Sequence, residues 1–399
     1  MATFLLQSKK KDLCPIPGLL FPSPLQYGIM TPFHWKRERF MNQAPLQLDT
    51  ELLLQWYDTR RRILPWREDP TPYHVWISEI MLQQTRVDAV IPYYERFLAA
   101  LPDVKALADA EEEVCLKLWE GLGYYSRIRN MHKAARQIMD EYGGQIPGTS
   151  KELQNLAGIG RYTSEAIASI AFGEVIPSVD GNLLRVFARR TEYEENIKSP
   201  QALRDAEVFY SQRISLDRPG DYNQAVMDLG ATICLPNGEP LCEQCPWNCL
   251  CQAHSSGTEL SYPVVPPKKA RTVSQHTAIL LRFDNLVLLE HRPEDGLLAG
   301  LPGFPMLDGH PTEKELKATL SSAATGLQIL MRKSYRHIFS HREWEVQVLE
   351  ILCSSQNEFE VAAAALFPGI QTITADISEI RTRYSIPTAF RPCIQYLQT

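Results

Sequence analysis

The chain of 399 residues has a mass of 45.4 kDa, and at roughly 100–200 residues per domain this length predicts two or three domains. Hydrophobic residues make up 44% and charged residues 22%, a composition that is typical of globular proteins and excludes a disordered or fibrous chain. With 41 basic and 47 acidic residues the net charge is −6, which argues weakly against a surface coated by nucleic acid but allows local basic patches.

Targeting signals and cysteine usage indicate the compartment. The N-terminal segment lacks the basic start, apolar run and small-residue cleavage site of a secretion signal, and the chain has no apolar stretch of about 18 residues. We therefore expect a cytoplasmic protein. Clustered thiols in a reducing compartment indicate a metal site. Five of the nine cysteines share one short segment: Cys234, Cys242, Cys245, Cys249 and Cys251.

The first half of the chain is expected to be almost entirely helical. Residues 1–44 mix prolines and lysines without a sustained period, and predict a poorly ordered extension. From Asp49 onward, apolar residues recur at helical spacing, with glycine or proline between the segments. Beyond this first helix, the predicted helices are Val75–Ala89, Tyr93–Ala99, Glu112–Trp119, Arg127–Tyr142, Ser150–Leu156, Thr163–Phe172, Asn182–Arg190 and Gln201–Ile214. We assign residues 45–254 to one helical domain, with its cysteine loop at 234–251.

The residue pattern and the predicted secondary structure change after the cysteine loop. Residues 255–274 are rich in proline and in basic residues, and predict a linker. β-like runs follow at His276–Phe283, Leu286–Glu290 and Trp344–Leu352, with a helical pattern at Glu313–Ala324. Residues 275–399 are therefore expected to form a separate α+β domain.

The segment from Leu156 to Thr163 has the pattern of two helices joined by a Gly-hydrophobic-Gly turn. Gly158 and Gly160 allow the backbone to approach a phosphate, and the following helix offers N–H groups at its positive end. A plain structural turn is the alternative for any single Gly-x-Gly. Seven basic residues favour phosphate binding, although such charges often only face solvent: Arg127, Arg129, Lys133, Arg136, Arg185, Arg189 and Arg190.

Two carboxylates are candidates for acid and charge-stabilising roles. Glu79 lies in the apolar helical run Val75–Leu82, where burial is expected to raise its pKa and keep it protonated near neutral pH. Asp180 precedes the helix that begins at Asn182, where an N-cap is its ordinary role unless Asn182 caps instead. An acid in an apolar environment, together with a carboxylate at a helix N-terminus, suits the cleavage of a glycosidic bond.

The cysteine loop offers four thiolates to a metal. The spacing Cys242-x2-Cys245-x5-Cys251, with Cys234 upstream, is typical of a zinc site or of an iron–sulfur cluster. Spacing alone leaves both open.

In their order along the chain, these motifs resemble the adenine DNA glycosylases of the MutY type, within the helix-hairpin-helix/Gly-Pro-Asp superfamily. The resemblance extends from about Leu52 to the C-terminus. Its most specific parts are Leu64–Arg67, Ser78–Thr85, Gly121–Tyr125, the hairpin, Val179–Asn182, the cysteine set and Phe339–His341. It implies a six-helix barrel with an iron–sulfur module, a Nudix-like domain after it, and the removal of adenine mispaired with 8-oxoguanine or guanine.

The resemblance also implies roles for individual residues. Glu79 is the acid that protonates the purine, Asp180 stabilises or covalently traps the sugar cation, and Tyr162 supports the site. Cys234, Cys242, Cys245 and Cys251 hold a [4Fe–4S] cluster. The implied DNA contacts are Leu64, Trp66, Arg67 and Asp228 around the flipped adenine, Gln84 and Tyr124 in the duplex, and Phe339, Ser340 and His341 around 8-oxoguanine. For Trp66 and Tyr124, ordinary aromatic packing is the alternative.

The residue type at position 162 distinguishes two kinds of glycosylase. A glycosylase that also cuts the strand needs an amine nucleophile for a Schiff base, and such relatives carry lysine at this position. Tyr162 therefore predicts a monofunctional hydrolase that leaves an abasic site. A bifunctional pyrimidine glycosylase of the endonuclease III type and a non-catalytic iron–sulfur DNA-lesion binder are the alternatives. The region after Gly303 lacks the glutamate run of Nudix hydrolases, so we expect no nucleotide hydrolysis there.

Two departures from the family pattern concern the cysteine loop and the hairpin. Seven residues separate Cys234 from Cys242 where six are usual, and Gly238 allows the extra residue to bulge outward. Cys249 is the alternative to Cys251 as the fourth ligand. Ala157 stands where proline is usual, and is expected to soften the turn slightly. We expect a monomer that binds double-stranded DNA containing 8-oxoguanine:adenine mispairs and has no membrane contact.

Overall fold

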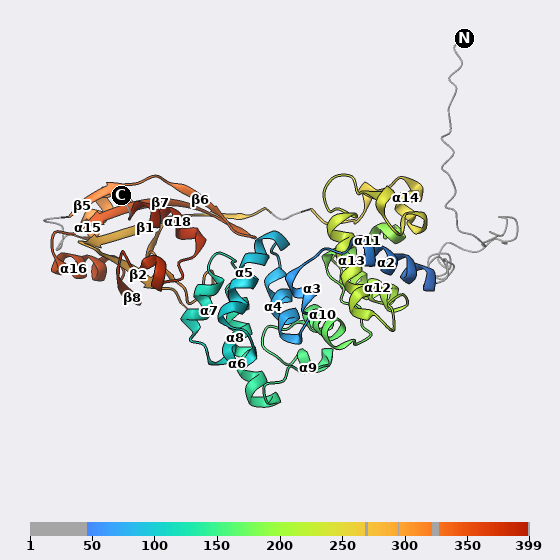
Figure 1. Cartoon of the computed structure of the whole chain (residues 1–399). Helices are drawn as coiled ribbons and strands as arrows, with labels where there is room; N and C mark the ends of the chain where they lie inside the picture. Colours follow the sequence, from blue (N-terminus) through green and yellow to red (C-terminus); the bar gives the residue numbers. More distant parts are fainter. Residues whose placement is uncertain (1–45, 268–269, 294, 321–326, 398–399) are drawn as a thin grey trace, which may run out of the picture. The chain divides into compact units, whose positions relative to one another are not determined.

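The computed structural model describes all residues except 1–45, 268–269, 294, 321–326 and 398–399 (Figure 1). The predicted N-terminal extension, part of the predicted linker and the end of the predicted Glu313–Ala324 helix therefore lie outside the described residues. The chain divides into two compact units: the segment up to Ile63 with Ala168–Pro266, and Leu64–Ile167 with Pro267–Thr399. Helix α10 (Arg161–Phe172) contributes to both units, because the division falls within it.

The first unit is helical. Aromatic and aliphatic side chains from four of its helices form one core, in which Leu53, Tyr57, Phe187, Tyr210 and Tyr222 are almost fully buried. Besides the end of α10, its elements are α2 (Leu46–Arg60), α11 (Gly181–Thr191), α12 (Pro200–Ser211), α13 (Pro219–Thr232), η1 (Cys242–Gln244), η2 (Asn248–Leu250), α14 (Gln252–Ser256) and η3 (Glu259–Ser261).

The helices of the second unit precede its sheet along the chain. They are α3 (Pro65–Glu68), α4 (Pro72–Leu82), α5 (Val87–Ala100), α6 (Val104–Asp109), α7 (Glu112–Trp119), α8 (Ser126–Tyr142), α9 (Ser150–Leu153) and the start of α10. The Thr71 hydroxyl caps α4 by accepting a bond from the His74 N–H, and α8 ends at Gly143 in the left-handed conformation.

An eight-stranded mixed sheet forms the C-terminal part of the second unit, with β3-β2-β1-β7-β5 as its main order. The long strands β1 and β7 run parallel, from Thr272 opposite Arg342 to Arg282 opposite Leu352, and the other pairs are antiparallel. The strands are β1 (Thr272–Phe283), β2 (Leu286–His291), β3 (Pro302–Gly303), β4 (Met306–Asp308), β5 (Gln328–Met331), β6 (Tyr335–Ile338), β7 (Arg342–Leu352) and β8 (Thr372–Asp376).

Both faces of the sheet are covered. Ala278 and Leu280 face one hydrophobic cluster, while Ile279 and Leu281 face another, as the alternation of side chains along a strand requires. This double burial explains why the strand is apolar without a break. The helical elements of this part are α15 (Glu313–Thr319), α16 (Gln356–Leu366), α17 (Ile380–Arg383), η4 (Thr388–Phe390) and α18 (Arg391–Tyr396). The predicted fold class, a helical half followed by an α+β half, is confirmed.

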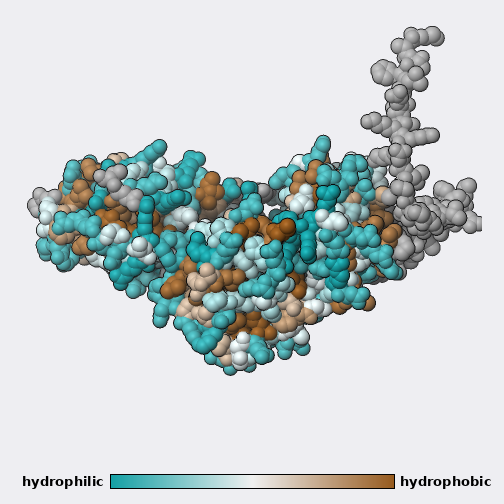
Figure 2. Space-filling view, viewed as in Figure 1, coloured by the Kyte–Doolittle hydropathy of each residue, from teal (hydrophilic) through white to brown (hydrophobic). Residues whose placement is uncertain are grey.

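The surface in view is mostly hydrophilic, with hydrophobic residues in scattered patches (Figure 2). Single large apolar residues are exposed, such as Ile63 and Leu216. Within the described part of the chain, no helix combines the length and the apolar character that a membrane span requires.

The helix boundaries around Leu82 differ from the prediction. The predicted Val75–Ala89 helix is broken, because α4 ends at Leu82 and Gln84 adopts a left-handed φ of 56°. The following helix, α5, runs through Pro92, although this residue lacks the N–H for a helical hydrogen bond. Buried Val90, Tyr94 and Phe97 hold α5 together across that position.

Helix α13 was not predicted, because Pro219, Gly220 and Gly230 make its sequence resemble a loop. Its glycines permit close helix packing. A Cβ on Gly220 would lie 2.8 Å from Ile170 Cα, and a Cβ on Gly230 would lie 2.6 Å from Asn182 Cβ. Tertiary contact with α10 and α11 therefore explains residues that would weaken an isolated helix.

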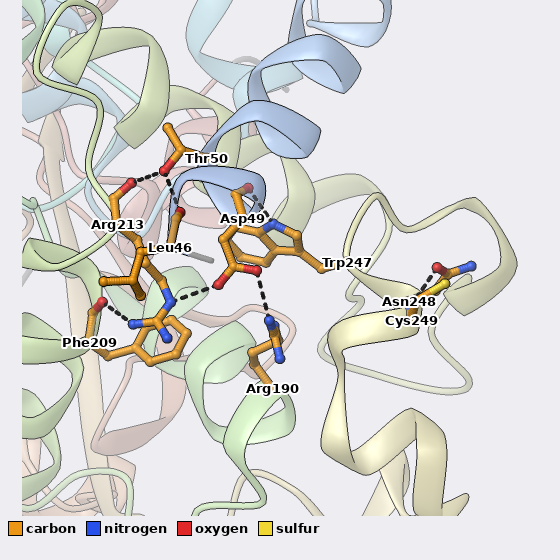
Figure 3. A network of polar contacts seen from close by, with 9 residues as sticks. All are labelled: Leu46, Asp49, Thr50, Arg190, Phe209, Arg213, Trp247, Asn248 and Cys249. Atoms are coloured by element: carbon orange, nitrogen blue, oxygen red, sulfur yellow. Dashed lines mark hydrogen bonds and ion pairs between the residues drawn. The ribbon is translucent and has the colours of Figure 1, made fainter. Parts of the chain in front are cut away.

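A buried ion network holds the first unit together (Figure 3). Asp49 in α2 is 1% exposed, and its two oxygens accept bonds from Arg190 Nη2 at 2.9 Å and Arg213 Nε at 2.8 Å. The Asp49 carbonyl also accepts from Trp247 Nε1 at 2.9 Å, which attaches the cysteine loop. One residue thus ties α2 to the end of α11, to the chain after α12 and to the cysteine loop.

Replacing Asp49 is expected to destabilise the first unit strongly. Asp49→Asn leaves two buried guanidinium groups without their counter-charge, which costs roughly 3–5 kcal/mol of unfolding free energy. The control is Asp58→Asn, which removes the exposed ion pair with Arg218 and should cost at most about 1 kcal/mol. Urea unfolding monitored by circular dichroism gives both values, and equal losses in the two variants would contradict the expectation.

Candidate active site and metal site

The predicted acid, Glu79, lies on α4 among buried apolar residues and is itself 7% exposed. Tyr162, near the start of α10, donates a hydrogen bond from its hydroxyl to Glu79 Oε2 at 3.0 Å. The end of α4 is attached to the same helix, since Gln83 Nε2 donates to Thr163 Oγ1 at 3.1 Å. The structure therefore brings together two predicted site residues that are far apart in the sequence, and orients the carboxyl group.

The predicted hairpin is present between α9 and α10. Gly158 has a φ of +74°, and a Cβ there would lie 2.5 Å from Asn130 Cβ, so only glycine fits. Gly160 has ordinary φ and open space around its Cα. The Ala157 N–H donates to Gln137 Oε1 at 2.8 Å, so this turn is anchored to α8 although it lacks the proline of the family pattern.

Gln84 and Tyr124, which are predicted to contact the duplex, both adopt left-handed backbone conformations, with φ of 56° and 51°. This conformation costs non-glycine residues about 1–2 kcal/mol, and such strain is typical of functional sites. Tyr124 Oη donates to Gln84 Oε1 at 2.6 Å and lies 2.6 Å from Ser340 Oγ in the turn between β6 and β7. Three predicted DNA-contacting residues thus form one exposed hydrogen-bonded group.

Arg127 holds this strained region in place. Its side chain is buried, and Nη1 donates to the carbonyls of Ile80, Met81 and Gln83 at 2.7–3.0 Å. Its Nη2 donates to the carbonyls of Leu122 and Gly123 at 3.3 and 3.0 Å. Arg127 therefore links the end of the helix that carries Glu79 to the turn that carries Tyr124. The interpretation of Arg127 as a phosphate contact is wrong, because its guanidinium group faces these carbonyls.

The other predicted DNA contacts of the second unit are divided between the interior and the surface. Leu64 and Trp66 are 5% and 6% exposed, and the Trp66 ring packs edge-on against Tyr94 at 5.3 Å. Arg67 is partly buried beside them on α3. Phe339 packs against His337 and Trp344, while His341 is exposed at the start of β7.

Asp180 is the N-cap of α11. Its Oδ1 accepts from the N–H groups of Asn182 and Leu183, each at 2.8 Å, and its Oδ2 accepts from Asn182 Nδ2 at 2.7 Å. The structure thus selects Asp180, and not Asn182, as the cap. Burial raises the pKa of the Asp180 carboxyl, while these hydrogen bonds and the positive charge of Arg185 oppose the rise.

Asn223 of α13 shapes the segment that leads to Asp180. It is fully buried, and its Oδ1 accepts from the Ser178 N–H at 3.0 Å. Its Nδ2 donates to Ser169 Oγ at 2.8 Å and to the Ile176 carbonyl at 2.9 Å. Asn223 thus joins α10, the extended segment and α13.

The four predicted ligands Cys234, Cys242, Cys245 and Cys251 come together in the first unit. Burial raises the pKa of the Cys242 thiol to about 12, with added effects of Glu259, Cys251 and Cys234. Burial also raises the pKa of Cys245, which is close enough to be influenced by the other three thiols. Four converging thiols suit zinc or an iron–sulfur cluster, and binding must release their protons.

Cys242 has further neighbours that can ligate a metal. Its sulfur, a His254 ring nitrogen and a Glu259 carboxylate oxygen lie within 4.8 Å of one another. Cys249, the substitute ligand of the prediction, directly follows Asn248, whose Oδ1 accepts from the Cys249 N–H at 2.6 Å (Figure 3).

Two arginines connect α11, the helix that Asp180 caps, to the cysteine loop. Arg185 Nη2 donates to Asn182 Oδ1 and Arg185 Nε to the Cys234 carbonyl, both at 2.8 Å. Arg189 Nη1 lies 3.3 Å from Cys234 Sγ and donates to the Leu235 carbonyl at 2.8 Å. Arg189 and Arg190 are 4% and 3% exposed, so their interpretation as phosphate contacts is also wrong.

Asp228 of α13 is 1% exposed and forms an ion pair within the first unit. It accepts from the Arg62 N–H at 3.1 Å, from Arg62 Nε at 2.7 Å and from Arg62 Nη2 at 2.6 Å. The carboxylate is thereby fixed in orientation by one arginine that no sequence motif included.

Arg62 and Asn223 were missed by sequence reasoning, and Arg127 was assigned another role. Only Arg127 left a signal, because it shares one face of the α8 helix with apolar residues at helical spacing, Met131 and Ile138. A charged residue on such a face needs buried partners. Arg62 and Asn223 lie in segments whose partners are distant in the sequence.

Comparisons with known proteins characterise both halves. Residues 77–211 match the HhH-GPD superfamily base excision DNA repair protein model, and residues 276–396 match the NUDIX domain model. An adenine DNA glycosylase of Rattus norvegicus is 35% identical over 86% of this chain and 77% of its own length. An adenine DNA glycosylase of Homo sapiens is 37% identical over 76% of this chain and 67% of its own length. A solved thermostable thymine-DNA glycosylase is 26% identical, covering 55% of this chain and 99% of its own, with a TM-score of 0.47.

Metal analysis of cysteine variants tests the ligand set. We expect Cys251→Ser to lose most of the bound metal, since Cys251 lies with Cys242 and Cys245, whereas Cys249→Ser retains it. The measurement is the metal content per protein chain, determined by inductively coupled plasma mass spectrometry on protein purified under anaerobic conditions. The reverse result, loss in Cys249→Ser alone, would make Cys249 the fourth ligand.

Proposed function

Because the chain belongs to the adenine DNA glycosylase family, within the HhH-GPD superfamily, we propose that it is a monofunctional glycosylase of base excision repair. It hydrolyses the N-glycosidic bond of adenine mispaired with 8-oxoguanine, and also with guanine, and leaves an abasic site. The observation that carries the proposal is the hydrogen bond from Tyr162 to the buried Glu79.

Glu79 is the general acid of this proposal. A carboxyl group held among apolar residues suits the protonation of a leaving purine, as the acid of a glycosidase protonates its leaving group. Tyr162 supports this role, because its hydroxyl fixes Oε2 at 3.0 Å and so fixes the direction of the other oxygen. The target adenine must leave the base stack before its sugar carbon can react.

Asp180 is the group that stabilises the positive charge on the sugar. Its carboxylate is held by two backbone N–H groups and the Asn182 amide, so its position requires no rearrangement as charge develops. The ionised form is the one that acts, whether by electrostatic stabilisation or by a transient covalent bond.

Tyr162 also supports a monofunctional reaction. Cleavage of the strand by a glycosylase requires a Schiff base between an amine and the sugar, and the hydroxyl of Tyr162 cannot form one. A bifunctional endonuclease III-type enzyme is the alternative that this residue disfavours. A non-catalytic lesion binder would not require Glu79 or Asp180.

Recognition of 8-oxoguanine is assigned to the turn between β6 and β7. Ser340 and His341 can both exchange hydrogen bonds with an oxidised base, and Ser340 already contacts Tyr124. The Phe339 ring is held by His337 and Trp344 on neighbouring strands, which gives the turn a rigid base.

A [4Fe–4S] cluster is the metal group that we assign to Cys234, Cys242, Cys245 and Cys251. The donor set fits, because four thiols converge and Arg189 offers a hydrogen bond to the Cys234 sulfur. When bound, the cluster cross-links the loop after α13 and has redox chemistry of its own. We further assign the enzyme to the cytoplasm, acting as a monomer on double-stranded DNA.

The proposed reaction is tested with a duplex that contains one 8-oxoguanine:adenine pair. The wild-type protein should release adenine, and the strand should break only after alkali treatment. Glu79→Gln should slow release at least about a hundredfold, because the acid is lost. Glu113→Gln, an exposed residue of α7, is the matched control and should be unaffected. If the wild-type protein releases no adenine, the proposed function is wrong. If the strand breaks without alkali, the enzyme is not monofunctional.

The pH dependence reports on Asp180. Burial raises the pKa of Asp180 from 3.8, so activity that needs its ionised form is present above the raised pKa and is lost as pH falls through it. The Asn182 amide opposes this rise, so Asn182→Ala should move the acid limb to higher pH. Asn196→Ala, in an exposed loop, serves as control. Single-turnover rates against pH give the limb, and a shift to lower pH contradicts the assignment.

A further inference from the structure

Within the described residues, side chains of α7, of α8 and of the turn between them make polar contacts with the C-terminal α+β domain of the second unit, and two of these side chains are the cations Lys117 and Arg129. We propose that Arg129 and Lys117 are positioning residues, which hold this domain on α7 and α8 and thereby set the selectivity for 8-oxoguanine opposite adenine. The inference rests on the function proposed above.

Arg129 of α8 makes the most specific of these contacts, and its interpretation as a phosphate contact is wrong, because its guanidinium group faces protein acceptors. Its Nη1 donates to the Ala299 carbonyl at 2.6 Å and its Nη2 to the Gly300 carbonyl at 2.8 Å. Its Nε donates to Glu112 Oε1 at 2.7 Å, which holds the guanidinium plane. The planar fork of arginine suits two neighbouring acceptors, whereas lysine offers a single point charge.

The loop between β2 and β3 is shaped to present these two carbonyls. Gly296, Leu298 and Gly300 all have positive φ, of 87°, 60° and 58°. A left-handed conformation at Leu298 is strained, so tertiary contacts must maintain it. Leu297 and Leu298 pack against the hydrophobic cluster on one face of the sheet, and Leu301 is fully buried. The acceptors are therefore firmly attached to the domain.

Lys117 of α7 makes the second contact. Its Nζ donates to the carbonyl of Arg381 and to that of Tyr384 at 3.2 Å, both at the C-terminal end of α17. Glu120 Oε2 lies 2.6 Å from the same ammonium group and holds it in place. Carbonyls in the last turn of a helix are suitable partners for a cation.

These contacts act on the recognition turn through the sheet. Phe339 beside Ser340 packs on the same hydrophobic cluster as Leu297 and Leu298. Arg129 and Lys117 therefore hold the body to which Ser340 is attached, while Tyr124 meets Ser340 from the turn between α7 and α8. Without the two cations, the exposed contact between Tyr124 and Ser340 is the polar contact that still links the turn before α8 to this domain among those described above.

The test compares two substrates. We expect Arg129→Met and Lys117→Met each to lower the ratio of single-turnover rates on 8-oxoguanine:adenine over guanine:adenine by roughly tenfold, the scale of lost charge-assisted hydrogen bonds. The rate on guanine:adenine, which lacks the oxidised atom, should stay within about twofold of wild type. Arg129→Lys should recover part of the ratio, because one bond can re-form.

A matched control is Arg96→Met. Arg96 also donates from Nη2 to a backbone carbonyl, that of Leu118 at 3.1 Å, but this bond stays among the helices. The ratio should therefore remain unchanged in this variant. An equal loss on both substrates in the Arg129 and Lys117 variants would overturn the proposal, because these residues would then only stabilise their helices.

Small-angle X-ray scattering of the full chain without DNA separates this inference from the proposed reaction. The double variant Arg129→Met/Lys117→Met should show a larger radius of gyration than the wild type and the Arg96→Met control. If the wild type releases no adenine, the proposed function fails, and the scattering still decides whether the two cations hold the domain. An unchanged scattering curve in the double variant overturns the inference in either case.

Discussion

The candidate active site depends on one buried guanidinium group. Arg127 donates to five backbone carbonyls, three at the end of α4 and two in the turn before α8. These carbonyls lie where a helix ends or a turn begins, and Arg127 supplies a buried donor to each of them, in addition to Trp119 Nε1 at Gly123 and Thr85 Oγ1 at Gln83. This cation thereby joins the end of the Glu79 helix to the turn in which Tyr124 adopts a left-handed conformation. The acceptors of Nη1 and Nη2 offset part of the cost of burying this charge, while Nε is buried without a hydrogen-bond partner.

The same interaction recurs in both units. In the first unit, Arg185 and Arg189 donate to carbonyls around Cys234, while Arg190 and Arg213 share the buried Asp49. These arginines stabilise the fold, so a count of basic residues overstates the charge that is available to DNA. The acidic net charge of −6 therefore says little about nucleic-acid binding, since several cations lie inside and are paired.

Much of the fold follows from local patterns. Apolar spacing predicted most of the helices and the change to strands, and the glycine at position 158 marked the hairpin because no other residue fits there. Local patterns failed where tertiary contact overrides propensity. Pro92 lies inside α5, and α13 contains glycines that allow other helices to approach closely. The burial of Glu79 was predictable, because a carboxylate in an apolar helix is unusual at the level of sequence alone.

The sequence by itself determined the order of the two domains, the family and the clustering of the thiols, and it predicted Glu79 as the acid, because residue type and spacing carry that information. Only the tertiary structure decided which side chains meet. It placed Tyr162 against Glu79 and made Asp180 the cap in place of Asn182. It also showed that Arg127 binds backbone carbonyls inside the protein and not a phosphate. The Tyr162–Glu79 bond and most of the Arg127 bonds join residues that lie tens of residues apart in the chain, and hydrogen bonds over such separations leave no periodic trace in a sequence.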